Sequence, residues 1–479
     1  MAAQPHSAVN LDAAFGEARP SDDLLVDGQG RFSTAELESA VGETAAGLAA
    51  AGVCVGDTVA FQLPITAQSV IAYRACWRIG AVAAALHPAA GSAQLAAALE
   101  QLDAHLVIAD PSMALAANTS ALTVEALRIG GLGEAVSAIS TANESTDATI
   151  LFTSGSSGAP KGVVHTHGSL FYKARQSAVV HGLGVDDAVL MPAPLAHMSG
   201  LLHAVTVPGC AGFKAVLMNR WDPGLALTLI ENEQITYMVG PPTFFIGLMD
   251  HPDFDPSRTA SLRMLSCGGA GVTPAFVQRA SEQLGAMVKR AYGSTEAPTL
   301  TTSRFDDPVE TMARSDGRTF DDTEVRVDDS GEIWARGPEL ARGYLDEVQT
   351  EAAFVDGWFR TGDLGVLTDG WLTITGRLGD VIIRAGENIS AGEVEQVLEA
   401  HPDVRHAVAI AEPDDRLGER VAAFVVAPDG FTLVKCREWF QESGAAKYIC
   451  PERIELIDAM PVLASGKPDR AALKDLLAT

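Results

Sequence analysis

A polar loop from Thr153 to Gly162 carries the side chains of this sequence that are best suited to chemistry. It combines four hydroxyl side chains, three glycines and Lys161. The glycines let the backbone approach a ligand without an intervening Cβ. Hydroxyls and a lysine among free backbone N–H groups suit a polyanion, above all a nucleotide triphosphate. A flexible Gly/Ser linker is the alternative, but linkers are not normally flanked by buried-type strands and closed by Pro-Lys-Gly.

Short apolar runs must position this loop and several other turns. Runs that read as strands end in glycine-rich or proline-rich turns at several places along the chain. The strand-and-turn pairs are 148–152 before the polar loop, 235–239 before 240–242, and 262–266 before 267–271. In open α/β sheets, ligands bind outside the carboxyl ends of the strands. We therefore expect these turns to share one pocket.

The wider pattern predicts an α/β protein with helices on the faces of a parallel sheet. A capping box at Ser33 and Glu36 opens a helix that Gly52 closes, and a second helix ends at Gly80. From about residue 320 the pattern changes to short alternating strands, which indicates a small β-rich subdomain. After residue 380 the tail reads as a small α+β unit. Residues 1 to about 30 are weakly patterned, and we expect them on the surface.

Composition sets limits on the function. The 479 residues are too many for one ordinary core, so two or three domains are expected. The net charge of −27 argues against nonspecific nucleic-acid binding and against docking on anionic membranes. Six scattered cysteines without a C-x-x-C pair indicate reduced thiols in a cytoplasmic protein. Neither a signal pattern nor a membrane-spanning run is evident.

The polar loop is neither a Walker P-loop, because no hydroxyl residue follows its lysine, nor a G-x-S-x-G hydrolase elbow. It resembles the phosphate loop of the adenylate-forming superfamily, which comprises acyl-CoA synthetases, adenylation domains and luciferases. Four later stretches match the motifs of that family in the right order, namely 292–296, 361–363, 376–377 and 466–467. The similarity runs from about residue 30 to the end, and the chain is most like a bacterial acyl-CoA ligase.

The resemblance implies an α/β fold with stacked αβα subdomains, a small β-barrel-like subdomain and a small mobile α+β C-terminal domain. The implied domains are 1–376 for AMP binding, with the β-rich subdomain at about 320–376, a hinge at 377–380, and 381–479. The hinge position itself is Gly379, where the family usually has Asp or Lys. Glycine permits the backbone change needed for the C-terminal domain to swing, but it supplies no side-chain anchor.

The reaction implied by the resemblance joins a carboxylate to ATP and then passes the acyl group to a thiol, with Mg²⁺ and coenzyme A as cofactors. Lys467, Glu296 and Thr153 are the implied catalytic residues, and Glu296 is the Mg²⁺ ligand. The implied nucleotide-binding residues are Thr153, Ser154, Gly155, Ser156, Ser157, Gly158, Lys161, Gly268, Gly269, Ala270, Tyr292, Gly293, Ser294, Thr295, Asp363 and Arg377. Gly386, Glu387 and Asn388 belong to a stretch that lines the CoA tunnel in the family.

The acyl pocket is expected at Met198, Gly240, Gly269 and Pro298, with His197 as a gate; an ordinary packed histidine is the alternative. Residues 194–203 contain no acidic side chain to pair with a substrate ammonium, so a neutral fatty, cyclic or aryl acid is favoured over an amino acid. Two other readings stay open: an acyl-AMP ligase that loads a carrier protein, and a non-catalytic nucleotide-binding regulator. No nucleic-acid partner and no integral membrane association are expected, and a homodimer is compatible with the resemblance.

Overall fold

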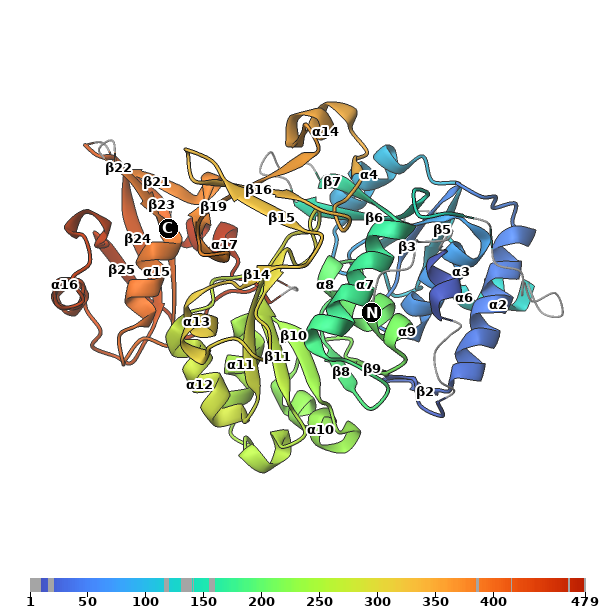
Figure 1. The fold of residues 1–479 in the computed structure, drawn as a ribbon, viewed down its shortest axis with the longest axis horizontal. Coiled ribbons are helices and arrows are strands. Elements are labelled where there is room, and N and C mark those ends of the chain that lie inside the picture. Colours follow the sequence, from blue (N-terminus) through green and yellow to red (C-terminus); the bar gives the residue numbers. More distant parts are fainter. Residues whose placement is uncertain are drawn as a thin grey trace.

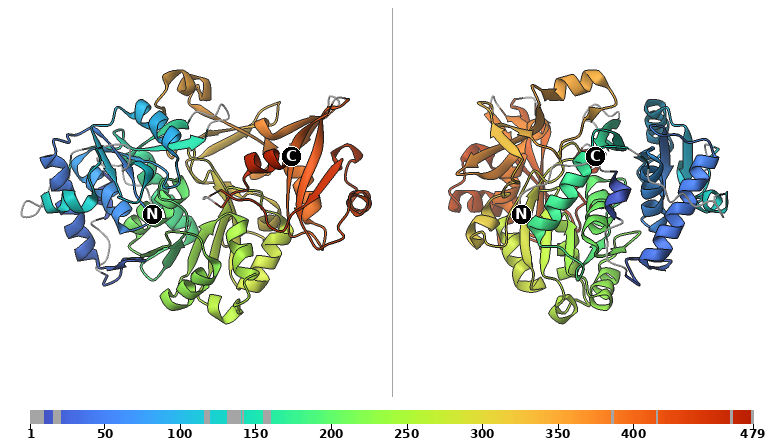
Figure 2. Two further views of the ribbon diagram at one scale, coloured as in Figure 1. Left: turned by 180° about the vertical axis from the view of Figure 1, so that it is seen from behind. Right: turned by 45° about the vertical axis from the view of Figure 1, so that its right-hand side comes forward.

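The computed structural model describes residues 10–15, 21–115, 120–130, 140, 142–154, 160–384, 387–414, 416–463 and 466–477. Within these residues the strands form four sheets. Figure 1 shows the N-terminal part of the chain at one end of the molecule and the C-terminal part at the other, with the middle of the chain between them; the two views of Figure 2 agree. The predicted α/β fold with a small C-terminal α+β unit is confirmed.

A nine-stranded sheet forms the centre of the large domain. Its strands, in spatial order, are β14 (Arg318–Thr319), β13 (Thr301–Thr302), β12 (Met287–Tyr292), β11 (Met264–Gly268), β10 (Tyr237–Gly240), β8 (Ala188–Met191), β9 (Lys214–Leu217), β1 (Leu25–Asp27) and β2 (Gly30–Phe32). Associated helices are α7 (His167–His181), α8 (Met198–Leu201), the π-helix η1 (Leu202–Thr206), α9 (Val207–Ala211), α10 (Pro223–Glu233), α11 (Pro242–Met249), α12 (Pro274–Leu284) and α13 (Val309–Arg314). Strands β10, β11 and β12 are parallel neighbours, so their carboxyl ends open on one edge.

A six-stranded sheet supports the polar loop. It consists of β17 (Gly343–Tyr344), β7 (Pro160–Thr166), β6 (Asp147–Ser154), β4 (Val82–Ala85), β3 (Thr58–Gln62) and β5 (Leu106–Ala109), with helices α2 (Thr34–Ala50), α3 (Ala67–Ile79), α4 (Ser92–Leu102) and α6 (Val124–Gly130). The capping box at Ser33 and Glu36 forms as predicted, and Gly80 ends α3 with a left-handed φ of 78°. Local signals of this kind placed most of these elements correctly.

Two smaller sheets follow. The first contains β15 (Glu324–Val327), β16 (Glu332–Arg336), β19 (Trp358–Thr368), β18 (Phe354–Val355) and β20 (Trp371–Arg377), with α14 (Glu347–Ala353) before β18. The C-terminal sheet contains β22 (Glu387–Ser390), β21 (Val381–Arg384), β24 (Gly418–Val426), β23 (His406–Asp414) and β25 (Arg453–Leu456), with α15 (Ala391–Glu399), α16 (Leu433–Glu442) and α17 (Arg470–Leu477). Between them lies the short 3₁₀ turn η3 (Leu378–Asp380), where the hinge is predicted.

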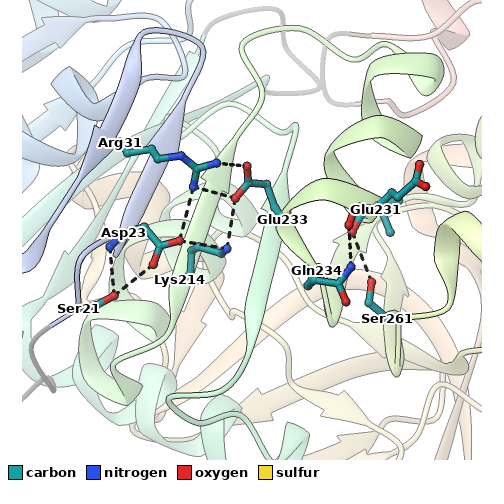
Figure 3. A network of polar contacts seen from close by, with 9 residues as sticks. Ser21, Asp23, Arg31, Lys214, Glu231, Glu233, Gln234 and Ser261 are labelled. Atoms are coloured by element: carbon teal, nitrogen blue, oxygen red, sulfur yellow. Dashed lines mark hydrogen bonds and ion pairs between the residues drawn. The ribbon is translucent and has the colours of Figure 1, made fainter.

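The expectation that residues 1 to about 30 lie on the surface is wrong in part. Residues 22 and 28–30 are exposed, but helix α1 (Leu11–Phe15) buries Leu11, Asp12 and Phe15, and β1 adds to the nine-stranded sheet parallel to β9. Figure 3 shows the polar network that fastens this end: Arg31 and Lys214 both pair with Glu233, and Lys214 also contacts Asp23 at 3.3 Å. The elements are too short for a periodic pattern to be recognised in the sequence.

Helix α1 also buries a charge. The Asp12 carboxylate accepts hydrogen bonds from Nε of Arg74 at 2.8 Å and from Nε of Arg78 at 2.6 Å, and both guanidinium groups also pair with Glu38. The Asp12 side chain is inaccessible to solvent, and the two arginines are only 5% and 8% exposed. A carboxylate that neutralises two buried cations cannot be removed without leaving them undercompensated.

None of the described helices is long and apolar enough to span a membrane.

We predict that Asp12→Ala lowers the free energy of unfolding by about 3 kcal/mol, because it leaves two buried guanidinium groups with a single partly exposed carboxylate. Urea unfolding followed by tryptophan fluorescence measures the change. Asp22→Ala is the matched control, since Asp22 is exposed, and it should alter stability by less than about 0.5 kcal/mol. Equal urea midpoints for the two variants would contradict the role assigned to Asp12.

Candidate functional site

Lys467 reaches from the C-terminal part of the chain to the edge of the nine-stranded sheet. A Cβ built on Gly269, which follows β11, would lie 3.0 Å from Cε of Lys467 and 3.6 Å from its Nζ. Gly269 has a φ of +78°, so both its conformation and its surroundings favour glycine. The lysine side chain therefore lies across bare backbone. Atoms of the large domain crowd the end of this side chain, although Lys467 as a whole residue is solvent-exposed.

Three further charged groups act on this lysine. Burial lowers the pKa of Lys467, and the nearby Arg377 lowers it further, whereas Asp363 and Glu296 oppose the decrease. Glu296 follows β12, and Asp363 and Arg377 lie opposite each other on β19 and β20. The structure thus brings together two carboxylates and two cations from motifs that are far apart in the sequence. This grouping is what a shared ligand pocket requires.

Asp363 is held through both oxygens. The hydroxyl of Tyr292 donates to Oδ2 at 2.8 Å, and Nε of Arg377 lies 3.2 Å from Oδ1. Burial raises the pKa of Asp363, while Arg377 and the tyrosine hydroxyl partly offset that increase. These contacts fix the carboxylate beside the Tyr292 ring. A fixed acceptor next to an aromatic ring suits a ribose and its base.

Glu296 is also positioned by a tyrosine. The hydroxyl of Tyr344 donates to its Oε1 at 2.8 Å, and Nζ of Lys161 lies 5.4 Å from the centre of the Tyr344 ring. Tyr344 belongs to β17, which pairs with the strand that carries Lys161. The hydroxyl occupies one lone pair of the carboxylate and leaves the others for a further ligand. Glu296 therefore fits an oxygen-ligated cation such as Mg²⁺, which takes one or two protein carboxylates together with phosphate oxygens.

A buried imidazole supports the Glu296 turn. Nε2 of His165, on β7, lies 2.7 Å from the carbonyl oxygen of Thr295, and Nδ1 lies 3.3 Å from Oγ of Ser169. Because a carbonyl can only accept a hydrogen bond, Nε2 carries the proton. Burial lowers the pKa of His165 to about 4, although the Thr295 carbonyl and Glu296 favour the charged form. His165 is therefore a neutral donor that orients the Thr295–Glu296 peptide.

The same turn contains a backbone outlier. Thr299 has a φ of +43°, which is unfavourable for a β-branched residue. Its carbonyl accepts a 2.6 Å hydrogen bond from the buried Lys173 of α7. A Cβ on Gly293 would lie 2.3 Å from the Thr299 nitrogen, so the two halves of the turn are in close contact. The turn is therefore compact, and Lys173 holds it through the Thr299 carbonyl.

Of the residues expected around the acyl group, His197 lies within the electrostatic influence of Lys467. The His197 ring packs edge-on against the ring of His87 with 5.0 Å between centres. Burial lowers the pKa of His197 to about 3, and His87 and Lys467 contribute to the decrease. Met198 and Pro298 are buried, and a Cβ on Gly240 would lie 2.6 Å from the Phe244 ring. An uncharged His197 next to Lys467 is consistent with a gate.

Some predicted residues are not brought to the cluster or cannot be placed. Gly155, Ser156, Ser157, Gly158 and Gly386 lie outside the described residues; Ser154 ends β6, and Asn388 lies in β22. Thr153 is opposite Lys161 in the β6–β7 pair. Glu387 is exposed on β22, which Figure 1 shows at the outer edge of the C-terminal part, away from β11 and β12. This arrangement keeps the expected CoA stretch apart from Lys467.

Sequence reasoning missed three residues of the site. These are Tyr344, His87 and His165. Tyr344 follows the Arg342–Gly343 pair in a short strand with no periodic pattern, and His165 lies in an apolar strand where a packed histidine is the ordinary interpretation. The one available signal was the position of His165 three residues after Gly162, on the strand that leaves the polar loop.

Comparison with known proteins agrees with this geometry. Residues 13–345 match the family model for the AMP-binding enzyme, and residues 393–467 match that for the AMP-binding enzyme C-terminal domain. A medium-chain fatty-acid–CoA ligase of Escherichia coli strain K12 is 34% identical, with 96% of this chain and 88% of the relative covered. Pyochelin synthase PchD of Pseudomonas aeruginosa strain UCBPP-PA14 is 31% identical, with 97% and 91% covered.

Among solved structures, ATP-bound MatB from Rhodopseudomonas palustris superposes with a TM-score of 0.89 at 26% identity over 98% of this chain and 99% of that one. The apo form of the same protein superposes with a TM-score of 0.81 at 27% identity and the same coverage. The chain belongs to the AMP-binding enzyme family of adenylate-forming enzymes, and within it to the AMP-forming acid–CoA ligases. The resemblance found from the motifs is thereby confirmed.

We predict that His165→Gln reduces the acid sensitivity of the fold. The folded-state pKa of His165, about 4, lies below the 6.5 of an unperturbed histidine, so the unfolded chain binds the proton more readily between these values. Stability is therefore complete above pH 6.5 and is lost as the pH falls toward 4, by about 1.4 kcal/mol per pH unit. Glutamine can still donate to Thr295 but does not titrate in this range.

Urea unfolding at pH 7.0 and 4.5 measures this effect. The loss of stability between the two pH values should be smaller by about 2.5 kcal/mol in His165→Gln than in the unmodified protein. His105→Gln, at an exposed histidine, is the control and should behave like the unmodified protein. An identical loss in all three proteins would show that His165 does not titrate with this shift.

Proposed function

We propose that the chain is an ATP-dependent carboxylate–CoA ligase. In the first half-reaction a carboxylate oxygen attacks the α-phosphorus of ATP, and pyrophosphate leaves. In the second half-reaction the thiol of coenzyme A attacks the acyl carbon, AMP leaves, and the thiol proton is released. The domain division into 1–376, a hinge at 377–380 and 381–479 is part of this proposal.

The observation that carries the proposal is the position of Lys467 against Gly269, within the electrostatic reach of Glu296 and Asp363. Two anions must approach each other in the first half-reaction, so positioning and charge compensation dominate the barrier. A cation at this point can bind the carboxylate and the α-phosphate together. Burial lowers the pKa of Lys467 despite the two nearby carboxylates. The protein alone therefore compensates the positive charge of this lysine incompletely.

Other residues would hold ATP around this point. Lys161 and the polar loop would bind the β- and γ-phosphates, and Thr295 the α-phosphate. Tyr292 would pack on the adenine, and Asp363 with Arg377 would bind the ribose hydroxyls. Glu296, fixed by Tyr344, would hold Mg²⁺, and the bound ion would neutralise part of the phosphate charge. His165 and Lys173 act through the backbone of the 293–299 turn rather than on ATP.

A neutral fatty, cyclic or aryl acid is the proposed substrate class. The segment around His197 packs into an apolar core that includes Ala193, Leu195 and Met198, and no carboxylate in residues 194–203 could pair with a substrate ammonium. Burying an unpaired ammonium would be costly. The medium-chain specificity named for the Escherichia coli relative supports the same class.

Coenzyme A is the proposed acceptor, and a carrier-protein thiol is the alternative that the pyochelin synthase relative keeps open. Glu387 and Asn388 would line the CoA path only after the C-terminal part has moved, since β22 lies at its outer edge here. Gly379 lies exposed in η3, and a Cβ there would meet no atom within 4 Å. A side chain would therefore fit at this position without a clash in this arrangement.

The deciding experiment supplies MgATP with short, medium-chain, cyclic and aromatic acids. Pyrophosphate release that depends on the acid, followed by thioester formation that depends on CoA, would support the ligase. Release that couples only to a holo carrier protein would favour the alternative acceptor. ATP binding without acid-dependent pyrophosphate release for any acid would indicate a non-catalytic nucleotide-binding protein.

We predict that Lys467→Ala slows adenylate formation by about 100- to 1,000-fold, because the transition state loses its positioned cation. Thioester formation from a supplied acyl-adenylate should remain close to normal. Lys474→Ala, at an exposed lysine of α17, is the matched control and should affect neither step. Unimpaired adenylate formation in Lys467→Ala would refute the role of this lysine.

A further inference from the structure

Two backbone hydrogen bonds hold the described residues around Lys467, namely Leu463, Gly466 and Lys467, which we call the lysine turn. The N–H of Gly466 donates to the Leu463 carbonyl at 2.8 Å, and the N–H of Leu463 donates to the Lys467 carbonyl at 2.8 Å. Gly466 is buried and has a φ of +80°. The direction of the Lys467 side chain is therefore determined by where this turn rests.

The lysine turn rests on the start of α11 in the large domain. A Cβ on Gly466 would lie 2.6 Å from Cε1 of Phe244 and 2.8 Å from Cγ of Pro241. Phe244 is itself stacked on Trp221, with 4.5 Å between ring centres and 25° between ring planes. This rigid apolar surface fits a glycine backbone and leaves no room for a side chain. It limits how close the turn can approach but supplies no directional bond.

Thr243 supplies that bond. Its Oγ1 donates to the carbonyl oxygen of Gly466 at 2.6 Å, across a separation of 223 residues. Within the described residues, this hydroxyl bonds to the lysine turn rather than to its own helix. The accepting carbonyl belongs to the residue directly before Lys467. The bond therefore fixes the peptide plane from which the Lys467 side chain projects.

We propose that Thr243 is a positioning residue for adenylate formation: its hydroxyl fastens the lysine turn to the large domain and so holds Lys467 over Gly269. The assignment rests on the proposed function, in which Lys467 serves only the first half-reaction. The closer superposition on ATP-bound MatB than on its apo form agrees with an arrangement suited to that step. The bond must break when the C-terminal part moves for thioester formation.

The size of the effect follows from the population of the fastened state. A neutral hydrogen bond of this kind shifts an equilibrium between a fastened and a released state by about 3- to 10-fold. Removing it should reduce the fraction of molecules with Lys467 in place by that factor when the released state predominates, and by less when the fastened state does. The chemistry of the fastened molecules should be unchanged, because Thr243 contacts the turn and not the reacting groups.

Thr243→Val removes the hydroxyl while keeping the shape of the side chain, and Thr243→Ser restores the hydroxyl. We expect Thr243→Val to slow acid-dependent pyrophosphate release by about 3- to 10-fold, with thioester formation from a supplied acyl-adenylate unchanged. Thr243→Ser should recover most of the rate. Thr228→Val is the matched control: Thr228 is exposed on α10, and its hydroxyl donates to Gly224 of the same helix.

A double-mutant comparison separates positioning from a structural role. If Thr243 acts through Lys467, Thr243→Val should cause no additional loss of adenylate formation in a Lys467→Ala background. An additional 3- to 10-fold loss there, an equal slowing of both half-reactions, or a normal rate in Thr243→Val would each overturn the proposal.

Hydrogen exchange separates this proposal from the proposed function. The amide hydrogens of Leu463 and Gly466 should exchange faster in Thr243→Val than in the unmodified protein, with and without MgATP, whether or not any acid is activated. Faster exchange in a protein that activates no acid would support the fastening and refute the ligase. Unchanged exchange in an active ligase would overturn the fastening alone.

Discussion

The site depends on one contact, the passage of the Lys467 side chain over the bare backbone at Gly269. It joins the C-terminal part of the chain to the carboxyl edge of the nine-stranded sheet, where a cation meets Glu296, Asp363 and Arg377. Two carboxylates and two cations nearly balance, but burial disfavours the charged lysine. An incoming anion would improve that balance, so the site is arranged for anions even though the protein is strongly acidic.

Around this contact, the structure fixes backbone as firmly as side chains. Tyr344 holds the Glu296 carboxylate, whereas His165 and Lys173 hold the carbonyls of Thr295 and Thr299 on either side of it. A turn with a strained threonine persists only because its surroundings determine it. Burial lowers the pKa of His165 to about 4 and that of Lys173 to about 7. Both side chains can therefore hold the turn without adding a full positive charge that would compete for the ligands.

The sequence was sufficient for most elements and for the motif residues because their signals are local. The capping box at Ser33, the glycine that ends α3 and the glycine-rich turns each reflect a few neighbouring residues. The supporting contacts were not predictable, because they join residues that are distant in the sequence: 48 positions separate Tyr344 from Glu296, and 130 separate His165 from Thr295. Helix α1 was missed for the same reason, since its burial depends on Arg74 and Arg78.

The parallel pairing of β1 with β9 has a consequence for how the protein is made. Leu25 lies beside Ala215, so about 190 residues must be synthesised after the first strand before its neighbour exists. At typical translation rates this takes roughly 10 to 40 seconds. During that interval β1 has its hairpin neighbour β2 but not its parallel neighbour β9, whereas helix α1 meets Arg74 and Arg78 much earlier. One side of the largest sheet is thus completed by a hairpin that is synthesised long before the strand it pairs with.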